Sequence, residues 1–392
     1  MPEQKLNSNV QPIVNSSAHI AAMPLLPAGM GGLVVLSLFD GMSCGQLALQ
    51  KAGIKVKQYY AAEIDKYAIQ VTQANFPDTI QLGDVTKVFA KDLPKIDLLI
   101  GGSPCQGFSF AGKMLNFKDP RSKLFFEFVR LKNECKPKWF FLENVQMPYE
   151  HELVISKYMG IEPIVINSRL LTAQNRVRNY WTNINEQPYG LFGYLKPNIP
   201  MPKDKKVLLH HITEPFASDK YLLSEKAIAK ILRRNWSIPK IEPDKTGAIL
   251  PKNNSGQLSV DSGTTLIRCV AMRGREACLS PKRTEYGKQI RKDYEAGKIK
   301  EQRKNIQQLE PRNDGKTNTL TSVQKDNLLQ IGDKVRRLTE LECERLQSVP
   351  DNYTNHVSST QRYKMLGNGW TVDVIAYIFG FMKSELAKSA EW

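Results

Sequence analysis

The stretch Leu33-Val34-Val35-Leu36-Ser37-Leu38-Phe39, followed by Asp40-Gly41, decides the fold. A continuous apolar run of this length is typical of a strand that is covered on both faces, as in a parallel sheet. A helix is expected to begin near Ser43 and to stop at Gly53. Glycines at 41 and 45 allow the backbone to approach a ligand closely. This order of strand, glycine loop and helix is typical of the first unit of a nucleotide-binding α/β fold.

Carboxylates follow the next two predicted strands. Glu63 ends the predicted strand 58–62, about twenty residues past the glycine loop, where an acidic side chain can accept hydrogen bonds from ribose hydroxyls. Asp84 follows the predicted strand 79–82 and could hold the exocyclic amino group of an adenine. The loop departs from the GxGxxG spacing, so NAD is less favoured than a ligand without a pyrophosphate. A solvated strand-end residue is the alternative for Glu63.

One cysteine stands out because of its position. Cys105 follows the apolar run 96–100 within the segment Gly101-Gly102-Ser103-Pro104-Cys105-Gln106. A thiolate is a soft nucleophile that can add to an electron-poor ring carbon. A buried structural cysteine is the alternative, because free cysteine is among the most buried residue types. The segments around it in the chain favour the reactive interpretation.

Six segments in order resemble the motifs of DNA cytosine-5 methyltransferases. The catalytic half is most similar to the de novo animal methyltransferases and their phage and bacterial relatives, over roughly residues 33–185 and 331–380. Each segment alone is weak support, whereas six in order are specific. The segments are 39–45, 103–106, 141–145, 174–178, 337–350 and 367–370.

The resemblance implies transfer of a methyl group from S-adenosylmethionine to carbon 5 of a cytosine flipped out of double-stranded DNA. Cys105 would add to carbon 6, Glu143 would contact ring nitrogen 3 and the exocyclic amine, and Asn144 would steady the Cys105 loop. Arg176 and Arg178 alternate on a predicted strand and so point to one face, where guanidinium groups can bind the base carbonyl and a phosphate. A salt-bridge role for Glu143 and plain surface charge for Arg176 are the alternatives.

The resemblance also implies a cofactor site built from the strand ends, the glycine loop and the last motif. The residues expected to bind S-adenosylmethionine are Phe39, Asp40, Gly41, Ser43, Cys44, Gly45, Glu63, Ile64, Asp84, Val85, Gly102, Pro104, Asn368 and Trp370.

Composition agrees with a nucleic-acid partner. The 392-residue chain has a net charge of +16 and a pI of about 9.4, which attracts polyanions but by itself leaves ribosomal, membrane-surface and DNA partners open. No apolar run approaches the roughly 18 residues that span a bilayer. Six scattered cysteines without metal-site spacing predict reduced thiols and no metal. We expect a cytoplasmic, nucleoid-associated protein of bacterial or phage origin; the motifs do not fix its oligomeric state.

The expected fold class is α/β, a doubly wound, mainly parallel sheet of the S-adenosylmethionine-dependent methyltransferase type with a smaller mixed target-recognition domain. We expect a flexible leader at 1–32, a catalytic and cofactor-binding domain at 33–186, the target-recognition domain at 187–330, and a C-terminal part at 331–392 that returns to the catalytic domain through a helix at 371–381.

Three segments are expected to contact DNA: a lid at 108–122 that closes over the flipped base, a basic turn at 267–275, and the stretch 315–321, which resembles the Thr-Leu element of the family's recognition domains. A helix at 222–236 and a basic helical insertion at 285–308 are also predicted, although most charges of the insertion fit a solvated face. Arginine can bind guanine with two hydrogen bonds. The expected DNA contacts are Ser109, Lys113, Arg121, Arg268, Arg273, Arg275, Thr319 and Leu320.

Two other functions fit the same fold. A tRNA cytosine-5 methyltransferase is less favoured because of the long recognition region and Ser103 in the nucleophile segment. A non-catalytic DNA-binding regulator is less favoured because Cys105, Glu143 and Arg178 are all present.

Overall fold

The computed structural model describes residues 31–102, 120–191, 193–224, 249–250, 265–274, 293, 296–298, 307–311, 314–322, 327–331 and 334–388. Its main sheet has seven strands in the order β3-β2-β1-β4-β5-β7-β6. Strands β3 to β5 pair in parallel, while β7 is antiparallel to both β5 and β6. The strands are β1 Leu33–Leu38, β2 Val56–Ala62, β3 Ile80–Gln81, β4 Leu98–Gly102, β5 Trp139–Val145, β6 Ile164–Asn167 and β7 Val177–Thr182.

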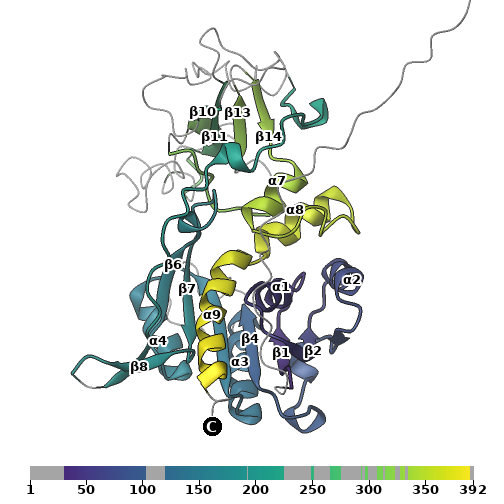
Figure 1. Cartoon of the computed structure of the whole chain (residues 1–392). Helices are drawn as coiled ribbons and strands as arrows, with labels where there is room; N and C mark the ends of the chain where they lie inside the picture. Colours follow the sequence, from purple (N-terminus) through teal and green to yellow (C-terminus); the bar gives the residue numbers. More distant parts are fainter. Residues whose placement is uncertain are drawn as a thin grey trace, which may run out of the picture.

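Helices cover both faces of this sheet, so the expected doubly wound, mainly parallel fold is confirmed (Figure 1). One face is covered by α1 (Cys44–Lys51), α2 (Lys66–Asn75) and α9 (Val372–Lys388). The other face is covered by α3 (Pro120–Cys135) and α4 (Tyr149–Met159). The last helix, α9, packs against α1, so residues 372–388 lie on the first sheet.

The continuous apolar runs of the central strands explain this arrangement. Successive side chains of a strand point to opposite faces. In β1, Val35 therefore joins the core on the α1 and α9 side, while Leu36 joins the core under α3 and α4. The neighbouring strand β4 repeats the pattern with Ile100 and Leu99. Because both faces are buried, each central strand must be apolar at every position rather than at alternate ones.

A second, antiparallel sheet lies beyond α7 (Glu340–Leu346) and α8 (Ser359–Asn368), at the opposite end of the molecule from the β8–β9 hairpin (Figure 1). It has five strands among the described residues. The division between domains expected at residue 330 falls within β13, whereas the second sheet continues through β14. The strands are β10 Ile249–Leu250, β11 Thr265–Gly274, β12 Gln307–Pro311, β13 Leu328–Ile331 and β14 Lys334–Arg337.

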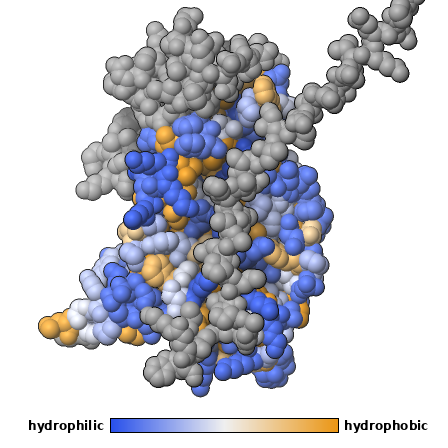
Figure 2. Space-filling view, viewed as in Figure 1, coloured by the Kyte–Doolittle hydropathy of each residue, from blue (hydrophilic) through white to orange (hydrophobic). Residues whose placement is uncertain are grey.

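Smaller elements complete the described chain. The hairpin of β8 (Glu186–Tyr189) and β9 (Tyr194–Pro197) projects from the main body, and its tip, which includes Leu191 at 94% exposure, is orange in Figure 2. The short 3₁₀ helices are η1 Val85–Lys87, η2 Ala90–Asp92, η4 Ser168–Leu170, η5 Leu209–His211 and η6 Asp219–Tyr221.

Several predicted segments fall on residues that the structure does not describe. The leader at 1–32, the lid at 108–122, the helix at 222–236 and the basic insertion at 285–308 lie wholly or mostly outside the described ranges. Within those ranges, no helix combines the length and the apolar character that crossing a bilayer requires.

Candidate active site

A cavity of about 390 Å³ lies where the carboxyl ends of β1, β2, β4 and β5 meet. The strand order reverses between β1 and β4, and such a reversal is where open α/β sheets bind ligands. The sequence-predicted residues that line this cavity are Phe39, Asp40, Gly41, Cys44, Glu63, Gly102, Glu143, Asn144, Arg176, Arg178, Asn368 and Trp370.

The loop after β1 is bent by left-handed backbone at three alternate positions. The φ angles of Phe39, Gly41 and Ser43 are 57°, 60° and 58°. Such a conformation is easy for glycine and costly for the other two, so the surrounding structure must hold it. Phe39 donates its N–H to the carbonyl of Ala62 at 2.9 Å, and the Ser43 N–H bonds the Asp40 carbonyl at 3.2 Å. The loop therefore curves around the cavity in a fixed shape.

The carboxylate of Asp40 is partly buried and is bound by hydroxyl groups at the cavity wall. It accepts hydrogen bonds from the Ser43 hydroxyl and from the Tyr59 hydroxyl, the latter at 2.7 Å. Burial raises the pKa of Asp40 to about 6. This acid therefore changes charge close to physiological pH, at the wall of the cavity.

Three main-chain amides fix Glu63 at the end of β2. One carboxylate oxygen accepts from the N–H of Gly41, and the other accepts from those of Ile64 and Asp65, each at 2.8 Å. A carboxylate offers about four acceptor positions, so capacity is left for a ligand. Its place in the cavity wall suits hydroxyl groups of a ribose.

The small residue at the end of β4 lets Trp370 enter the site. A Cβ atom on Gly102 would lie 2.7 Å from the Trp370 ring nitrogen and 3.3 Å from Glu143 Oε2. The Trp370 ring packs edge-on against Phe141, with 5.4 Å between ring centroids. Any larger residue at Gly102 would displace this wall of the cavity.

The thiol of Cys44 also lines the cavity, but it is suited to packing rather than to reaction. Its side chain is buried, and burial raises the pKa of Cys44 to about 12. Because the thiolate is the nucleophilic form, this cysteine stays an unreactive thiol at neutral pH.

Glu143 and Arg178 form an ion pair on the β5 and β7 side of the cavity. The distance between Arg178 Nε and Glu143 Oε1 is 2.9 Å, and the two side chains are only 12% and 11% exposed. The antiparallel register of β7 against β5 sets Arg178 opposite Val145, next to the end of β5. The pair thus presents a carboxylate and a guanidinium together at one place in the wall.

Arg176 lies deeper than Arg178 and binds main-chain carbonyls. Its guanidinium donates to Gly369 at 2.9 Å, to Leu320 at 3.3 Å and to Gly367 at 3.4 Å. Burial lowers the pKa of Arg176 to about 10, which still leaves it charged at neutral pH. Arg176 therefore ties β7 to the Gly367–Trp370 segment and to the loop that precedes β13.

Five predicted cofactor residues do not line the cavity. Ser43 is fully buried beneath the loop, and a methyl group at Gly45 would overlap the Ile100 side chain. Ile64 is 77% exposed, and Val85 is in the core. Asp84 caps η1 by accepting from the Thr86 N–H at 3.0 Å, which lowers the pKa of Asp84. Their contacts with a cofactor stay predictions.

The predicted nucleophile, one predicted cofactor residue and three predicted DNA contacts are not among the residues that the structure describes. Pro104, Cys105, Ser109, Lys113 and Arg275 lie outside the described residues. For three further arginines, the structure describes the backbone but not the side chain. These are Arg121 on α3 and Arg268 and Arg273 on β11.

The last two predicted DNA contacts, Thr319 and Leu320, lie at the junction between the two sheets. The Thr319 hydroxyl donates to the Asn175 carbonyl at 2.9 Å. Leu320 is only 5% exposed. Contacts of either residue with DNA stay predictions.

Sequence reasoning missed an ion pair at the cavity wall. Lys364 of α8 contacts Asp65, with 2.7 Å between Nζ and Oδ2, and both residues line the cavity. Asp65 is also the N-cap of α2, accepting from the Tyr67 N–H at 3.0 Å. Helical spacing could have found Lys364, because it lies four residues before Asn368 on the same helix face. In the described part of the chain, no cluster of three or more metal-ligating side chains is found.

Comparisons with known proteins show the family. The model of the C-5 cytosine-specific DNA methylase family matches residues 33–384. The chain is 31% identical to the type II methyltransferase M1.ScrFI of Lactococcus lactis subsp. cremoris, over 91% of this chain and 79% of the relative. It is 27% identical to the orphan methyltransferase M.SPRI of Bacillus phage SPR, over 89% of this chain and 97% of the relative.

Solved structures show the same fold at lower identity. The methyltransferase EhMeth of Entamoeba histolytica aligns with a TM-score of 0.54 at 14% identity, over 91% of this chain and 99% of that one. Dnmt2 of S. pombe aligns with a TM-score of 0.51 at 16% identity, over 90% and 99%. The family expected from six sequence segments is therefore confirmed, and with it the general reaction, methylation of cytosine at carbon 5 in DNA. This chain belongs to the family of C-5 cytosine-specific DNA methylases.

Proposed function

We propose that the cavity binds S-adenosylmethionine and that this chain methylates carbon 5 of a cytosine flipped out of double-stranded DNA, with Cys105 as the covalent nucleophile. One observation carries the proposal: a single cavity is lined both by Glu63, suited to a ribose, and by the Glu143–Arg178 pair, suited to a pyrimidine base. Nucleoside and target base would thus lie side by side, as methyl transfer requires.

The residues present fit the cofactor. A volume of about 390 Å³ lies in the range of small-molecule sites. Glu63 would hold the ribose hydroxyls, while Phe39, Gly102 and Trp370 would enclose the rest of the molecule. S-adenosylmethionine supplies an electrophilic methyl group when it is bound. The loop after β1 would form one side of the cofactor site, because Phe39, Asp40 and Gly41 line the cavity.

The chain's own residues prepare the base. Carbon 5 of cytosine is a weak nucleophile until the aromatic ring is broken. The Cys105 thiolate would form a bond to carbon 6 and so raise the electron density at carbon 5. Glu143 would bind nitrogen 3 and the exocyclic amine, and Arg178 holds its carboxylate in place. Carbon 5 would take the methyl group from S-adenosylmethionine, which would leave as S-adenosylhomocysteine. Carbon 5 would then lose its proton to water or hydroxide, the bond between carbon 6 and the Cys105 sulfur would break, and the thiolate would return.

The charge distribution supports a duplex DNA partner. Residues 187–330 contain 27 Lys and Arg against 15 Asp and Glu, so this stretch holds 12 of the 16 excess positive charges. Neutralising phosphates is the main source of affinity for duplex DNA. Arg268 and Arg273, which we propose as base contacts, belong to this stretch, on β11. The bacterial and phage sources of the two relatives support a bacterial or phage-encoded enzyme that acts on DNA in the cytoplasm.

A duplex that contains 5-fluorocytosine tests the proposal, because fluorine at carbon 5 prevents the final elimination. With S-adenosylmethionine, the wild-type chain is expected to form a covalent adduct that survives denaturing electrophoresis. Cys105→Ser should form no adduct and should lose at least about 10³-fold in methyl transfer. Cys135→Ser, at a half-buried cysteine of α3, is the matched control and should behave as wild type.

Two results would contradict the proposal. One is full methyl transfer by Cys105→Ser. The other is an adduct with tRNA that contains 5-fluorocytosine and none with the duplex.

A further inference from the structure

A loop of the second sheet pairs with the segment that precedes β7 of the first sheet. Residues 314–322 lie between β12 and β13, and Thr317 forms a parallel bridge with Gln174. The Thr317 N–H donates to the Ala173 carbonyl at 2.7 Å, and the Asn175 N–H donates to the Thr317 carbonyl at 2.9 Å. The segment that precedes Arg176 and Arg178 therefore pairs, as a strand would, with a loop of the second sheet.

Side chains extend this pairing on both sides. The Thr319 hydroxyl donates to the Asn175 carbonyl at 2.9 Å. The Leu320 N–H donates to the side-chain oxygen of Gln174 at 2.9 Å, and the Gln174 amide nitrogen donates to the Leu346 carbonyl at 3.1 Å. Gln174 is fully buried, so these bonds have no competition from water.

Lys316 fixes the start of the same loop. Its side chain is only 3% exposed, and its ammonium donates to the carbonyls of Arg169, Val207 and Thr172 at 2.7, 2.8 and 3.2 Å. An ammonium group has three donors, and all three are used. Lys316 thus joins the 168–172 turn before β7 to the chain that leads toward the second sheet.

The far end of the loop meets the cavity through Arg176. The guanidinium of Arg176 binds the Leu320 carbonyl and also those of Gly367 and Gly369, which line the cavity. A Cβ atom on Gly367 would overlap the main chain of Thr321, so this part of the loop lies directly on α8. A contiguous set of hydrogen bonds therefore runs from the second sheet to the residue two positions before Arg178.

We propose that residues 316–320 position the Glu143–Arg178 pair. The way in which the second sheet binds DNA would then determine the geometry of this pair in the cavity wall. Lys316 and Thr319 are the positioning residues, and the inference rests on the proposed function. Strands β12 and β13 flank the loop, so a shift of the second sheet moves the loop with it. Because the loop is bonded to residues 173–176, that shift reaches Arg178 through the chain.

A variant series separates this role from a direct contact with DNA. Thr319→Val removes the hydroxyl donor, Thr319→Ser retains it, and Lys316→Met removes the buried ammonium. The control is Lys334→Met, at an exposed lysine of β14. For each protein, the single-turnover rate of methyl transfer, the Kd for duplex DNA and the Kd for S-adenosylmethionine are measured at one salt concentration.

Positioning predicts a loss of rate without a loss of binding. Thr319→Val should lower the single-turnover rate about five- to tenfold, with both Kd values within about twofold of wild type. Thr319→Ser should restore the rate to within about twofold, because the hydrogen bond to Asn175 is kept. Lys316→Met should show a larger loss of rate, and Lys334→Met should match wild type.

Two results overturn the inference. If Thr319→Val weakens duplex binding and keeps its rate at saturating DNA, Thr319 contacts DNA and does not position the arginine. If its rate is unchanged throughout, the loop has no role in the reaction. The comparison of Thr319→Val with Thr319→Ser tests the inference even if Lys316→Met does not fold. Failure of the proposed function would appear separately, as a wild-type chain that forms no adduct with 5-fluorocytosine.

Discussion

Arg178 and Glu143 meet across two antiparallel strands, with Arg178 Nε 2.9 Å from Glu143 Oε1, in the wall of the cavity. Both side chains are nearly nine-tenths buried, so neither is free to rotate into solvent. A charge-assisted hydrogen bond of this kind is stronger and more directional than a neutral one. The guanidinium therefore fixes the orientation of the carboxylate in the cavity wall.

Glu143→Gln is expected to lower methyl transfer by about 10²- to 10⁴-fold, because it removes the carboxylate that we propose binds nitrogen 3 of the base. Arg178→Lys keeps the positive charge but loses the planar fork, and it should lower the rate about tenfold. Both variants should bind S-adenosylmethionine within a fewfold of wild type. Transfer of a radiolabelled methyl group to duplex DNA measures the first effect, and calorimetry measures the second. A Glu143→Gln rate above a tenth of wild type would contradict the assignment.

Glu63→Gln should weaken binding of S-adenosylmethionine at least about tenfold, or about 1.4 kcal/mol. A glutamine side chain keeps one acceptor oxygen. Its NH₂ group, however, would face a main-chain N–H that now donates a hydrogen bond to the Glu63 carboxylate. Isothermal titration calorimetry measures the change. Glu150→Gln, at an exposed position of α4, is the matched control and should leave the affinity unchanged. Equal affinities for the two variants would argue against a ribose contact at Glu63.

Asp40 should make the stability of the ligand-free protein depend on pH. Burial raises its pKa from 3.8 to about 6, so the folded protein holds this proton more tightly than the unfolded chain. Well below pH 4, Asp40 is protonated in both the folded and the unfolded state, and its contribution to the free energy of unfolding is fully present. This contribution is lost as the pH rises through 6 and stays lost above that. Relative to wild type, Asp40→Asn should therefore gain about 1–3 kcal/mol between pH 4 and pH 7. Urea denaturation across this pH range measures the difference.

The same group should link cofactor binding to proton release. S-adenosylmethionine carries a net positive charge, so it favours the ionised form of Asp40 in the cavity wall. The wild-type Kd is expected to fall as pH rises from 5 to 7, whereas that of Asp40→Asn should change little. Calorimetry in buffers of different ionisation enthalpy counts the protons released near pH 6. An identical pH dependence in both proteins would show that another group is responsible.

The strand ends could be predicted from the sequence because they depend on local patterns. The apolar run 33–39 became β1, and the predicted strand 58–62 became most of β2. Parallel strands bring their carboxyl ends to one edge, so Glu63, Gly102 and Glu143 meet in the cavity as expected. The final helix begins where it was predicted but continues to Lys388, because no glycine or proline stops it after residue 381.

Other parts of the site depend on contacts that no local pattern encodes. In the sequence, Lys316 is one of many basic residues in the predicted recognition region. Only the fold shows that its ammonium group is buried among three main-chain carbonyls. Lys364 likewise meets Asp65 only because α8 packs beside the loop after β2. Asp84 was expected at the cavity, but its carboxylate caps η1. Short polar side chains often bond their own backbone in this way.

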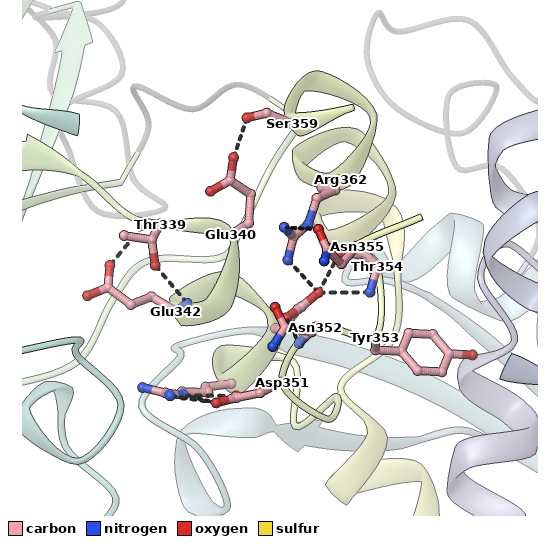
Figure 3. Close-up of polar contacts among 12 residues, drawn as sticks. Thr339, Glu340, Glu342, Asp351, Asn352, Tyr353, Thr354, Asn355, Ser359 and Arg362 are labelled. Atoms are coloured by element: carbon pink, nitrogen blue, oxygen red, sulfur yellow. Dashed lines mark hydrogen bonds and ion pairs between the residues drawn. The ribbon is translucent and has the colours of Figure 1, made fainter. Parts of the chain in front are cut away.

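The stability of the helix pair α7–α8 should depend on the buried ion pair between Glu344 and Arg362; Figure 3 labels Arg362 beside Asn352 and Thr354. Glu344 is fully buried and accepts from Arg362 at 2.9 Å, from the Thr354 N–H at 2.9 Å and from the Asn352 N–H at 2.7 Å. Glu344→Gln would leave the Arg362 charge buried without its partner, which costs about 3–5 kcal/mol. The free energy of unfolding in urea measures this cost.

Asp351→Asn is the matched control, because it removes the carboxylate of a half-exposed pair with Arg345 in the same region. An exposed pair contributes at most about 1 kcal/mol, so this variant should unfold close to wild type. Because α8 carries Lys364 and Asn368 of the cavity wall, the Glu344 variant should also lose affinity for S-adenosylmethionine, while the Asp351 variant should keep it. Equal losses of stability in the two variants would mean that burial is not what makes the Glu344–Arg362 pair important.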